Sequence, residues 1–358
     1  MKKFVLYSSG ICNEVFTKDI CLIPFVMQKY YGYESSILTY TKEQNFPDND
    51  KYLGHMKITS IENDEHLDRE LESSDVIMMF GIYDDVIDLI YRYKRLNENG
   101  KIYLKLDINS YWLNSLHVNM NNYIMGALKK CDLITAENRN SQEFINNNWG
   151  VRVEYIPNGY YEFVSDDYIN YKEKKNVILF VGRVGSPDKA NHILLEAFAR
   201  IENEIEDWSI ELVGNVDPGF MGYINEYYYN NPKRRERVRL VGFLGKKELK
   251  EKYKQSKIFC LTSPSEACAN VFSQAISNGC YLISTDVDGA RDITNNEEFG
   301  CIVPVYDIDR LSIALKETCL NEKLLEENCI VAQKYAKESL NWIKLCDKIN
   351  NFLFHKSS

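Results

Sequence analysis

Residues 263–279 join a strand to a helix through a loop that carries a carboxylate. Their sequence, SPSEACANVFSQAISNG, follows the apolar run 258–261, begins with a turn signal and ends at Gly279. Glu266 is therefore expected where a strand of an open α/β sheet gives way to a helix. Ligands bind in α/β folds at this carboxyl edge of the sheet. The stretch therefore predicts a ligand site, and further residues of this site must come from other parts of the chain.

The helix expected after this loop offers two further groups to a ligand. Asn270 and Val271 would place backbone N–H groups at its N-terminus, which favours the binding of a phosphate. Gln274 lies eight positions after Glu266, about two helical turns along, so one ligand could contact both side chains.

Short apolar runs alternate with amphipathic helical patterns along the whole chain, which predicts parallel βαβ units in doubly wound sheets. The expected strands are 3–7, 35–40, 75–80, 101–106, 132–136, 152–156, 177–181, 210–213, 238–240, 258–261 and 281–284. The expected helices include 18–31, 111–130, 139–148, 190–204, 247–255, 270–278, 311–318 and a long helical tail from 324. The turn Pro157-Asn158-Gly159 marks a boundary between residues 1–160 and 161–339. We therefore expect an α/β chain of two Rossmann-like domains.

Composition narrows the class of protein. The 358 residues suit two domains, 45% of them are apolar, and the net charge of −9 argues against a nucleic-acid binder. The ten cysteines include no Cys-x-x-Cys pair, and no secretory signal or bilayer-spanning stretch is found. We expect a cytoplasmic protein with reduced cysteines, with room for peripheral contact at the inner face of the membrane. Neither a Gly-x-Gly-x-x-Gly motif nor a P-loop follows the first strand of either domain, which disfavours a dinucleotide oxidoreductase or an NTPase.

A second motif supplies positive charge. Gly182-Arg183-Val184-Gly185 directly follows the strand 177–181, and Lys189 comes six residues after Arg183. Glycines allow a tight turn off the strand, and the two cations would lie beside the start of the next helix. Charge-assisted hydrogen bonds from such cations stabilise anionic oxygens. An exposed pair of basic residues is the alternative interpretation of these two side chains.

The two motifs together resemble a known family. Gly182-Arg183-x5-Lys189, followed by Ser263-x2-Glu266-x3-Asn270-Val271-x2-Gln274-x4-Gly279, is similar to the C-terminal domain of retaining glycosyltransferases of family 4. The resemblance runs in order from about residue 177 to residue 300. It implies the GT-B fold, with two facing Rossmann-like domains and a nucleotide-sugar bound mainly to the second. It also implies a final helix, about 340–356, that crosses back onto the first domain.

The family assigns a role to each matching residue. Arg183 and Lys189, after Gly182, would hold the donor diphosphate and neutralise it as it leaves, and Glu266 would bind hydroxyls of the transferred sugar. Asn270 and Val271 would offer N–H groups to the phosphates. The second acid of the family's Glu-x7-Glu motif, which binds ribose, is Gln274 here, which can bond a hydroxyl but brings no charge.

Other positions match less closely. Gly242-Phe243-Leu244 corresponds to the segment that meets the base, with Phe243 and Leu244 as candidates, and Gly289 to a loop near the donor sugar. Of the family's glycine-rich first loop only Gly10 remains. Where many members carry a histidine this chain has Asp107, a candidate on the acceptor side. His117, in the next helix, is expected to be a helix-surface or packing residue and not a catalyst.

Two Asp-x-Asp triplets, 286–288 and 307–309, could hold a divalent cation beside a diphosphate. Because Arg183 and Lys189 already supply positive charge, we expect no metal and no prosthetic group.

The resemblance implies a transferase that moves a hexose from a UDP- or GDP-sugar to a hydroxyl of a glycan or glycolipid, with retention. One alternative is another GT-B enzyme, such as an epimerase or a phosphorylase. The second is a weakened or non-catalytic partner subunit of a glycosyltransferase, which Gln274 and the altered first domain favour. Sequence leaves all three open.

Overall fold

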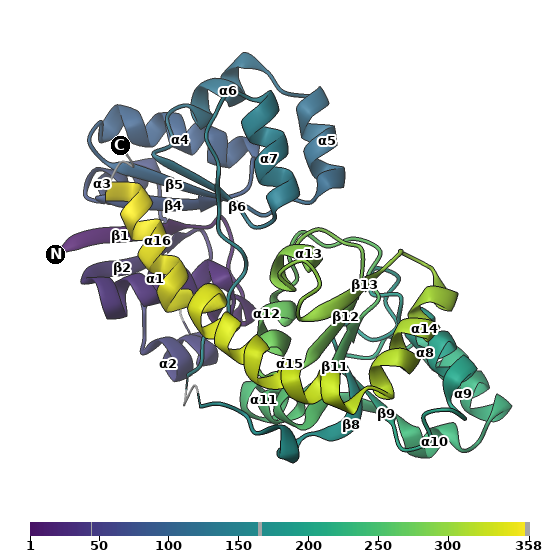
Figure 1. Cartoon of the computed structure of the whole chain (residues 1–358). Helices are drawn as coiled ribbons and strands as arrows, with labels where there is room; N and C mark the ends of the chain where they lie inside the picture. Colours follow the sequence, from purple (N-terminus) through teal and green to yellow (C-terminus); the bar gives the residue numbers. More distant parts are fainter. Residues whose placement is uncertain (44, 164–166, 355–358) are drawn as a thin grey trace. The chain divides into compact units, whose positions relative to one another are not determined.

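The computed structural model describes residues 1–43, 45–163 and 167–354. The chain divides into two compact units, each built round one parallel sheet (Figure 1). Unit 1 comprises Met1–Val164 and Asn341–Ser358, and unit 2 comprises Ser165–Leu340. Unit 1 is therefore assembled from two separate pieces of chain.

Unit 1 contains a seven-stranded sheet in the order β3-β2-β1-β4-β5-β6-β7. Its strands are β1 (Lys2–Tyr7), β2 (Tyr33–Thr39), β3 (Lys57–Ser60), β4 (Val76–Phe80), β5 (Lys101–Leu106), β6 (Leu133–Ala136) and β7 (Glu154–Tyr155). Its α-helices are α1 (Asp19–Tyr31), α2 (Pro47–Leu53), α3 (Asp64–Glu72), α4 (Asp84–Leu96), α5 (Ser110–Val118), α6 (Asn122–Leu128), α7 (Arg139–Asn148) and α16 (Trp342–Phe354). The strand order reverses between β1 and β4, as in doubly wound folds.

Unit 2 contains a six-stranded sheet in the order β10-β9-β8-β11-β12-β13. Its strands are β8 (Lys175–Val181), β9 (Ser209–Val213), β10 (Val238–Gly242), β11 (Ser256–Leu261), β12 (Tyr281–Thr285) and β13 (Gly300–Val303). Its α-helices are α8 (Asn191–Ile201), α9 (Phe220–Asn230), α10 (Arg234–Arg237), α11 (Lys246–Gln255), α12 (Asn270–Ser277), α13 (Ala290–Ile293), α14 (Ile308–Cys319) and α15 (Glu322–Tyr335). The order reverses between the neighbours β8 and β11, so both sheets confirm the doubly wound prediction.

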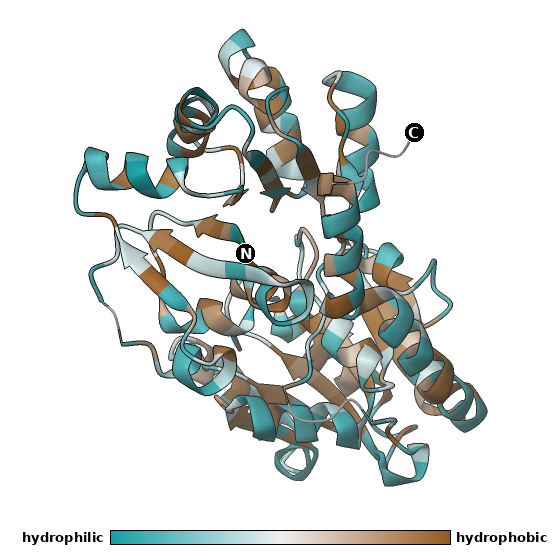
Figure 2. Cartoon of the chain, turned by 90° about the vertical axis from the view of Figure 1, so that its left-hand side faces the viewer, coloured by the Kyte–Doolittle hydropathy of each residue, from teal (hydrophilic) through white to brown (hydrophobic). Residues whose placement is uncertain are grey.

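The central strands are buried on both faces because helices cover the sheets. In β4, Val76 to Met79 are all buried, and in β11 the whole strand is buried. In Figure 2 many strand residues are brown (hydrophobic), although some strands also carry white and teal residues, and the helices carry much teal (hydrophilic). Continuous apolar strands are the pattern of parallel sheets, which explains why the sequence revealed them.

Helix α16 completes the core of unit 1, as the sequence predicts. The apolar stripe Trp342, Leu345, Ile349 and Leu353 is buried in the same cluster as side chains of β1 and α1. Two residues of the expected helix, 355 and 356, lie outside the described residues.

The sequence-based prediction was wrong for residues 111–130, which form two helices and not one. The chain leaves α5 at Asn119, and Asn121 begins α6 by accepting a hydrogen bond from the N–H of Ile124 at 2.9 Å. Asparagine competes with the helical backbone for hydrogen bonds, so it favours such caps. The sequence also missed two edge strands of four residues, β3 and β13, and the helices α2, α3, α9, α10 and α13.

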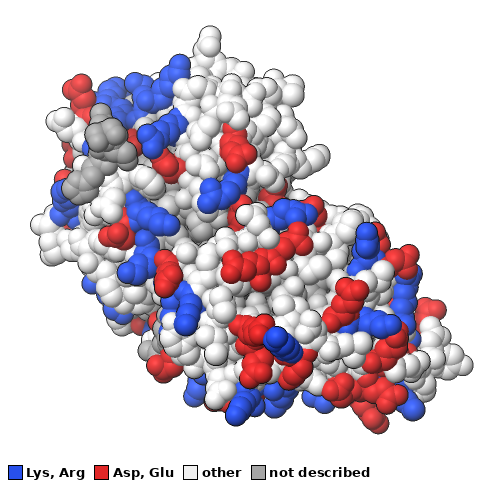
Figure 3. Space-filling view, viewed as in Figure 1, with Lys and Arg blue, Asp and Glu red and all other residues white. Residues whose placement is uncertain are grey.

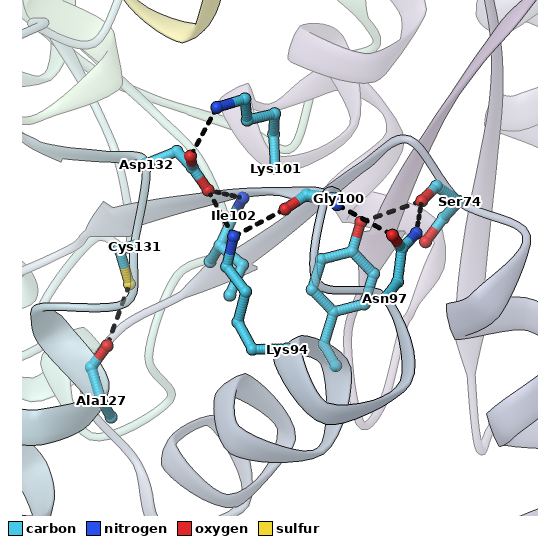
Figure 4. Close-up of polar contacts among 10 residues, drawn as sticks. Ser74, Lys94, Asn97, Gly100, Lys101, Ile102, Ala127, Cys131 and Asp132 are labelled. Atoms are coloured by element: carbon cyan, nitrogen blue, oxygen red, sulfur yellow. Dashed lines mark hydrogen bonds and ion pairs between the residues drawn. The ribbon is translucent and has the colours of Figure 1, made fainter.

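Asp132 fastens the amino ends of β5 and β6 (Figure 4). Its carboxylate accepts hydrogen bonds from Lys101 Nζ at 2.8 Å and from Lys94 Nζ and the Ile102 N–H, each at 3.0 Å. Burial alone would raise the pKa of the Asp132 carboxyl, but these donors outweigh burial and lower it. This edge is the opposite one from the edge where ligands bind in such sheets.

All ten cysteines are free, and seven of them are buried at 0–6% exposure, namely Cys21, Cys260, Cys268, Cys280, Cys319, Cys329 and Cys346. Within the described part of the chain, no helix is both long enough and apolar enough to cross a bilayer.

Candidate functional site

The loops after β8 and β11 meet at the carboxyl edge of the unit 2 sheet. Because these neighbouring strands flank the reversal of strand order, the crevice between their loops is where such folds bind ligands. The first loop, residues 182–190, carries Arg183 and Lys189, and the second, 262–269, carries Glu266. Chain segments almost eighty residues apart are thus brought together.

Thr262, the first residue after β11, ties the two loops. Its hydroxyl lies 3.0 Å from the carbonyl oxygen of Lys189 and 3.1 Å from that of Ala190. Ala190 has a positive φ of 44°, an uncommon conformation for a residue with a side chain. The contacts from Thr262 therefore hold the backbone of Lys189 and Ala190 just before α8.

Lys189 and Glu266 form an ion pair. The Nζ of Lys189 donates a hydrogen bond to Oε1 of Glu266, and the two side chains are 19% and 15% exposed. Both charged groups are therefore mostly withdrawn from water, where an ion pair is screened less than at the surface. The sequence motif named both residues but did not show that they contact each other.

Arg183 is held by an acid that the sequence analysis missed. Its guanidinium pairs with Asp188, and Lys189 Nζ lies 3.9 Å from the same carboxylate. Burial would raise the pKa of the Asp188 carboxyl, but hydrogen bonds from Ser186 and Arg183 outweigh burial and lower it. Arg183 is 70% exposed, so its guanidinium is accessible to an anion from solvent. Asp188 directly precedes Lys189 in the sequence, and this position was the signal that could have identified it.

Helix α12, which follows the loop that carries Glu266, begins without a side-chain cap. Ala269 is the N-cap residue, in extended conformation, and it makes no side-chain cap hydrogen bond. The first N–H groups of a helix have no partner within it, so those of Asn270 and Val271, both half-buried, suit an anion.

Gln274 lies on the same helix, half-buried, as the spacing predicts. Its backbone carbonyl accepts hydrogen bonds from Ser277 and Asn278. Among the described residues, its side-chain amide has no hydrogen-bond partner.

Gly289 brings the loop after β12 against the loop that carries Glu266. It has a φ of +77°, and a Cβ added there would lie 2.9 Å from Cβ of Cys268. Only glycine adopts this conformation readily and allows so close an approach. Gly289 therefore borders the same loop cluster as Glu266.

A chain of backbone contacts links the segment 242–244 to Gly182. The N–H of Gly182 donates to Val213 and that of Gly214 donates to Gly242, both at 2.9 Å. A Cβ on Gly214 would lie 1.8 Å from the carbonyl oxygen of Gly182, so no side chain fits there. Beyond Gly242, the ring of Phe243 is 73% exposed and Leu244 is half-buried.

Gly10 belongs to unit 1, in the loop after β1. A Cβ there would have only Thr41 Oγ1 nearby, at 3.9 Å, so this position does not require glycine for space.

Asp107 follows β5 at the carboxyl edge of the unit 1 sheet and is exposed. Two residues earlier, Lys105 is completely buried, and its ammonium pairs with Asp19 Oδ2 at 2.8 Å and Glu137 Oε2 at 2.6 Å. Burial would lower the pKa of Lys105, but the carboxylates of Asp19 and Glu137 raise it well above its usual range. Sequence reasoning missed this buried cluster, because a lysine in a strand gives no sign of burial.

His117 is exposed on α5, in agreement with the expected surface or packing role. Its Nδ1 accepts a hydrogen bond from the Trp149 indole at 2.9 Å, and its ring meets Phe144 edge to face.

Both Asp-x-Asp triplets have other partners. Asp286 pairs with Arg291, Asp309 pairs with Arg200, and Asp307 caps α14 by accepting from the N–H of Arg310. Among the described residues no group of three His, Cys, Asp or Glu side chains is placed to hold a metal ion.

Known proteins resemble this chain in sequence and in fold. The family model of the glycosyl transferases group 1 matches residues 166–338. These residues are a glycosyl transferase group 1 domain. The Glu266 loop, the Arg183 loop and α12 all lie inside this glycosyl transferase domain.

Curated relatives support the same family. The chain is 22% identical over 183 residues to the phosphatidyl-myo-inositol mannosyltransferase of Mycobacterium tuberculosis, covering 50% of this chain and 47% of that protein. It is 25% identical over 229 residues to a Campylobacter jejuni enzyme named N-acetylgalactosamine-N,N'-diacetylbacillosaminyl-diphospho-undecaprenol 4-alpha-N-acetylgalactosaminyltransferase, covering 60% and 58%. The chain thus matches about half the length of these relatives.

Solved structures match over nearly the whole chain. HepE from Anabaena in complex with UDP aligns with a TM-score of 0.74 at 17% identity and covers 99% of each chain. A sucrose-phosphate synthase from Thermosynechococcus elongatus aligns with a TM-score of 0.73 at 15% identity and covers 98% of each. The glycosyl transferase domain and unit 1 together therefore have the two-domain α/β GT-B fold.

Proposed function

We propose that the protein transfers a hexose from a nucleoside-diphosphate sugar to a hydroxyl of a glycan or glycolipid, with retention at the anomeric carbon. The observation that carries the proposal is the Lys189–Glu266 pair beside the uncapped start of α12. A cation, a carboxylate and free helix N–H groups within one loop cluster suit a diphosphate joined to a sugar.

In this proposal the donor's diphosphate lies against α12. Asn270 and Val271 donate N–H groups to it, and Lys189 and Arg183 supply two positive charges. Arg183 exchanges its Asp188 partner for a phosphate oxygen, which its 70% exposure permits. Charge that develops on the leaving diphosphate is then stabilised by groups already in position.

Glu266 binds hydroxyls of the sugar, and Gln274 binds a ribose hydroxyl through its amide. Phe243 offers an exposed ring on which the base stacks, next to the backbone of Leu244. We favour a UDP-sugar, because similar structures are described as complexes with UDP.

Retention requires a base on the face that the leaving group departs from. Retaining hydrolases use two carboxyl groups about 5 Å apart: an acid/base on that face, and a nucleophile that attacks the anomeric carbon from the opposite face. Glu266 is instead paired with Lys189, which favours the departing phosphate as the acceptor of the proton. The anomeric configuration of the product, read by NMR, tests this step.

The Arg183→Ala variant tests the diphosphate site. We expect kcat to fall about 10²–10³-fold, the loss seen when one stabilising group of a transition state is removed. Arg200→Ala is the matched control. Arg200 is also a partly exposed arginine paired with an aspartate, Asp309, but it lies near the C-terminal end of α8, whereas the Arg183 loop precedes this helix. Nucleoside diphosphate release from a panel of UDP- and GDP-sugars measures turnover. Near-normal turnover in Arg183→Ala would contradict the assigned role.

A weakened partner subunit remains the second candidate, because Gln274 replaces an acid of the family's motif. Thermal shift with UDP and GDP separates the two, since a tight ligand raises apparent stability. Nucleotide binding without transfer or hydrolysis of any sugar in the panel would favour the subunit. Gln274→Glu should then increase nucleotide affinity.

A further inference from the structure

Helix α5 of unit 1 presents an outer face without charge. No Asp, Glu, Lys or Arg occurs in the 21 residues from Ile108 to Leu128, although 27% of the chain is charged and about six would be expected. Figure 3 shows the part of unit 1 over α5 almost free of charged side chains. Surface helices normally carry charged residues on the side away from the core, so this face is unusual.

The outer face of α5 carries two open aromatic rings. Tyr111 is 75% exposed and Trp112 is 60% exposed, and the rings contact each other edge to face, with centroids 5.9 Å apart. Among the described residues, neither the Tyr111 hydroxyl nor the Trp112 indole N–H has a hydrogen-bond partner. Asn114, Ser115 and Val118 continue this face at helical spacing and are exposed. We call the face formed by these five residues the α5 platform.

The α5 platform is held rigidly from behind. Leu113 is buried and Leu116 packs against the core of unit 1. Asn109 caps the helix by accepting from the N–H of Trp112 at 2.9 Å, and His117 is fixed by Trp149. A surface that is already ordered loses little conformational entropy when it binds a ligand.

We propose that the α5 platform binds an uncharged saccharide chain. The C–H faces of pyranose rings are apolar and stack on aromatic rings, while sugar hydroxyls bond amides, hydroxyls and the indole N–H. The α5 platform offers each of these groups and no charge. An interfacial helix that binds anionic lipid carries lysines or arginines on its polar face, and the α5 platform has none.

This inference deepens the proposed function, because it names a neutral glycan as the acceptor class, and that assignment rests on the proposed function. The binding of a saccharide to the α5 platform does not depend on the proposed function. Saccharide binding and donor binding are therefore measured separately on the full chain.

Trp112 provides the readout. The other three tryptophans, Trp149, Trp208 and Trp342, are at most 4% exposed, so a change in exposed-indole fluorescence reports on Trp112. The probes are neutral gluco-, manno- and galacto-oligosaccharide series, and separately vesicles of phosphatidylcholine with phosphatidylglycerol. We expect one neutral series to shift the emission to shorter wavelength in a saturable manner. The Trp112→Phe variant should lose this shift.

Calorimetric titration with the same series tests the affinity. Tyr111→Ala and Trp112→Ala should each weaken it about tenfold or more, while UDP binding by thermal shift stays unchanged. Tyr229→Ala is the matched control, because Tyr229 is 84% exposed on α9 in unit 2 and should leave the affinity unchanged.

The inference is overturned if no neutral series binds, if both alanine variants bind as wild type does, or if only the vesicles change the fluorescence. Saccharide binding without any UDP or GDP binding would refute the proposed transfer and leave the α5 platform standing. Donor turnover without saccharide binding would refute the saccharide site on the α5 platform and leave the proposed transfer standing.

Discussion

Replacing Lys105 with methionine should destabilise unit 1, because it leaves two carboxylates in the interior without their cation. Lys105 is fully buried, Glu137 is 1% exposed and Asp19 is 9% exposed. Methionine retains most of the lysine stem, so the variant loses the charge and leaves little cavity.

The expected loss follows from the burial. Removing one partner of a buried ion pair costs about 3–5 kcal/mol, since the remaining charge is left uncompensated. Domains are stable by only about 5–15 kcal/mol, so this change would take a large share of the free energy of unfolding. The Oε1 atom of Glu137 already has no partner among the described residues, which leaves the carboxylate no alternative donor.

The loss should depend on pH. Burial raises the pKa of the Glu137 carboxyl well above its usual range; the Lys105 ammonium opposes this and the neighbouring Asp107 carboxylate adds to it. A carboxyl whose pKa is raised on folding contributes stability below its unfolded pKa and loses it as the pH rises through the folded pKa. Without Lys105 that folded pKa rises further, so the variant should be closest to wild type near pH 5 and weakest near pH 8.

Amide hydrogen exchange of β5 and β6 at pH 5 and pH 8 measures the free energy of opening in unit 1 alone. The rates must be corrected for intrinsic exchange at each pH. Lys101→Met is the matched control on the same strand, where Lys101 is 33% exposed and Asp132 keeps Lys94, so the loss should stay below about 1 kcal/mol. Adding Glu137→Gln to Lys105→Met should recover part of the loss. Equal losses in Lys105→Met and Lys101→Met at pH 8 would refute this reasoning.

Three further predictions concern the site and the fold. Gly214→Ala should abolish UDP binding in a thermal-shift assay, because the new Cβ would lie 1.8 Å from the Gly182 carbonyl oxygen. Gly222→Ala is the control and should bind UDP normally, because there is open space around Gly222. Unchanged UDP binding in Gly214→Ala would contradict the link between the loops. Trp342→Ala should cost unit 1 about 3–5 kcal/mol by denaturant unfolding, since this fully buried side chain joins α16 to the core, and a loss under 1 kcal/mol would show that α16 is dispensable. Turnover should be unchanged after dialysis against EDTA, and recovery only on adding Mg²⁺ or Mn²⁺ would show that Arg183 and Lys189 do not suffice.

The sequence determined the fold class because local pattern carries it. Apolar runs such as 177–181 and 258–261 are strands in the structure, and the stripe on 342–353 is a buried helix face. It also placed Glu266 and Arg183 after strands and Asn270 at a helix start, since turn residues and periodicity are local properties. The break in the predicted helix 111–130 was missed because Asn119 and Asn121 act through cap geometry, which hydrophobic period does not register.

Only the tertiary structure decided which side chains meet. Lys189 and Glu266 pair because strand order makes β8 and β11 neighbours, and nothing in either motif states that order. In the same way, Asp188 holds Arg183, and Lys105 is buried between carboxylates that lie far from it in sequence. Charge and residue type are written in the sequence, but burial and pairing arise from long-range packing. The chemistry of the site therefore depends on contacts that local pattern cannot specify.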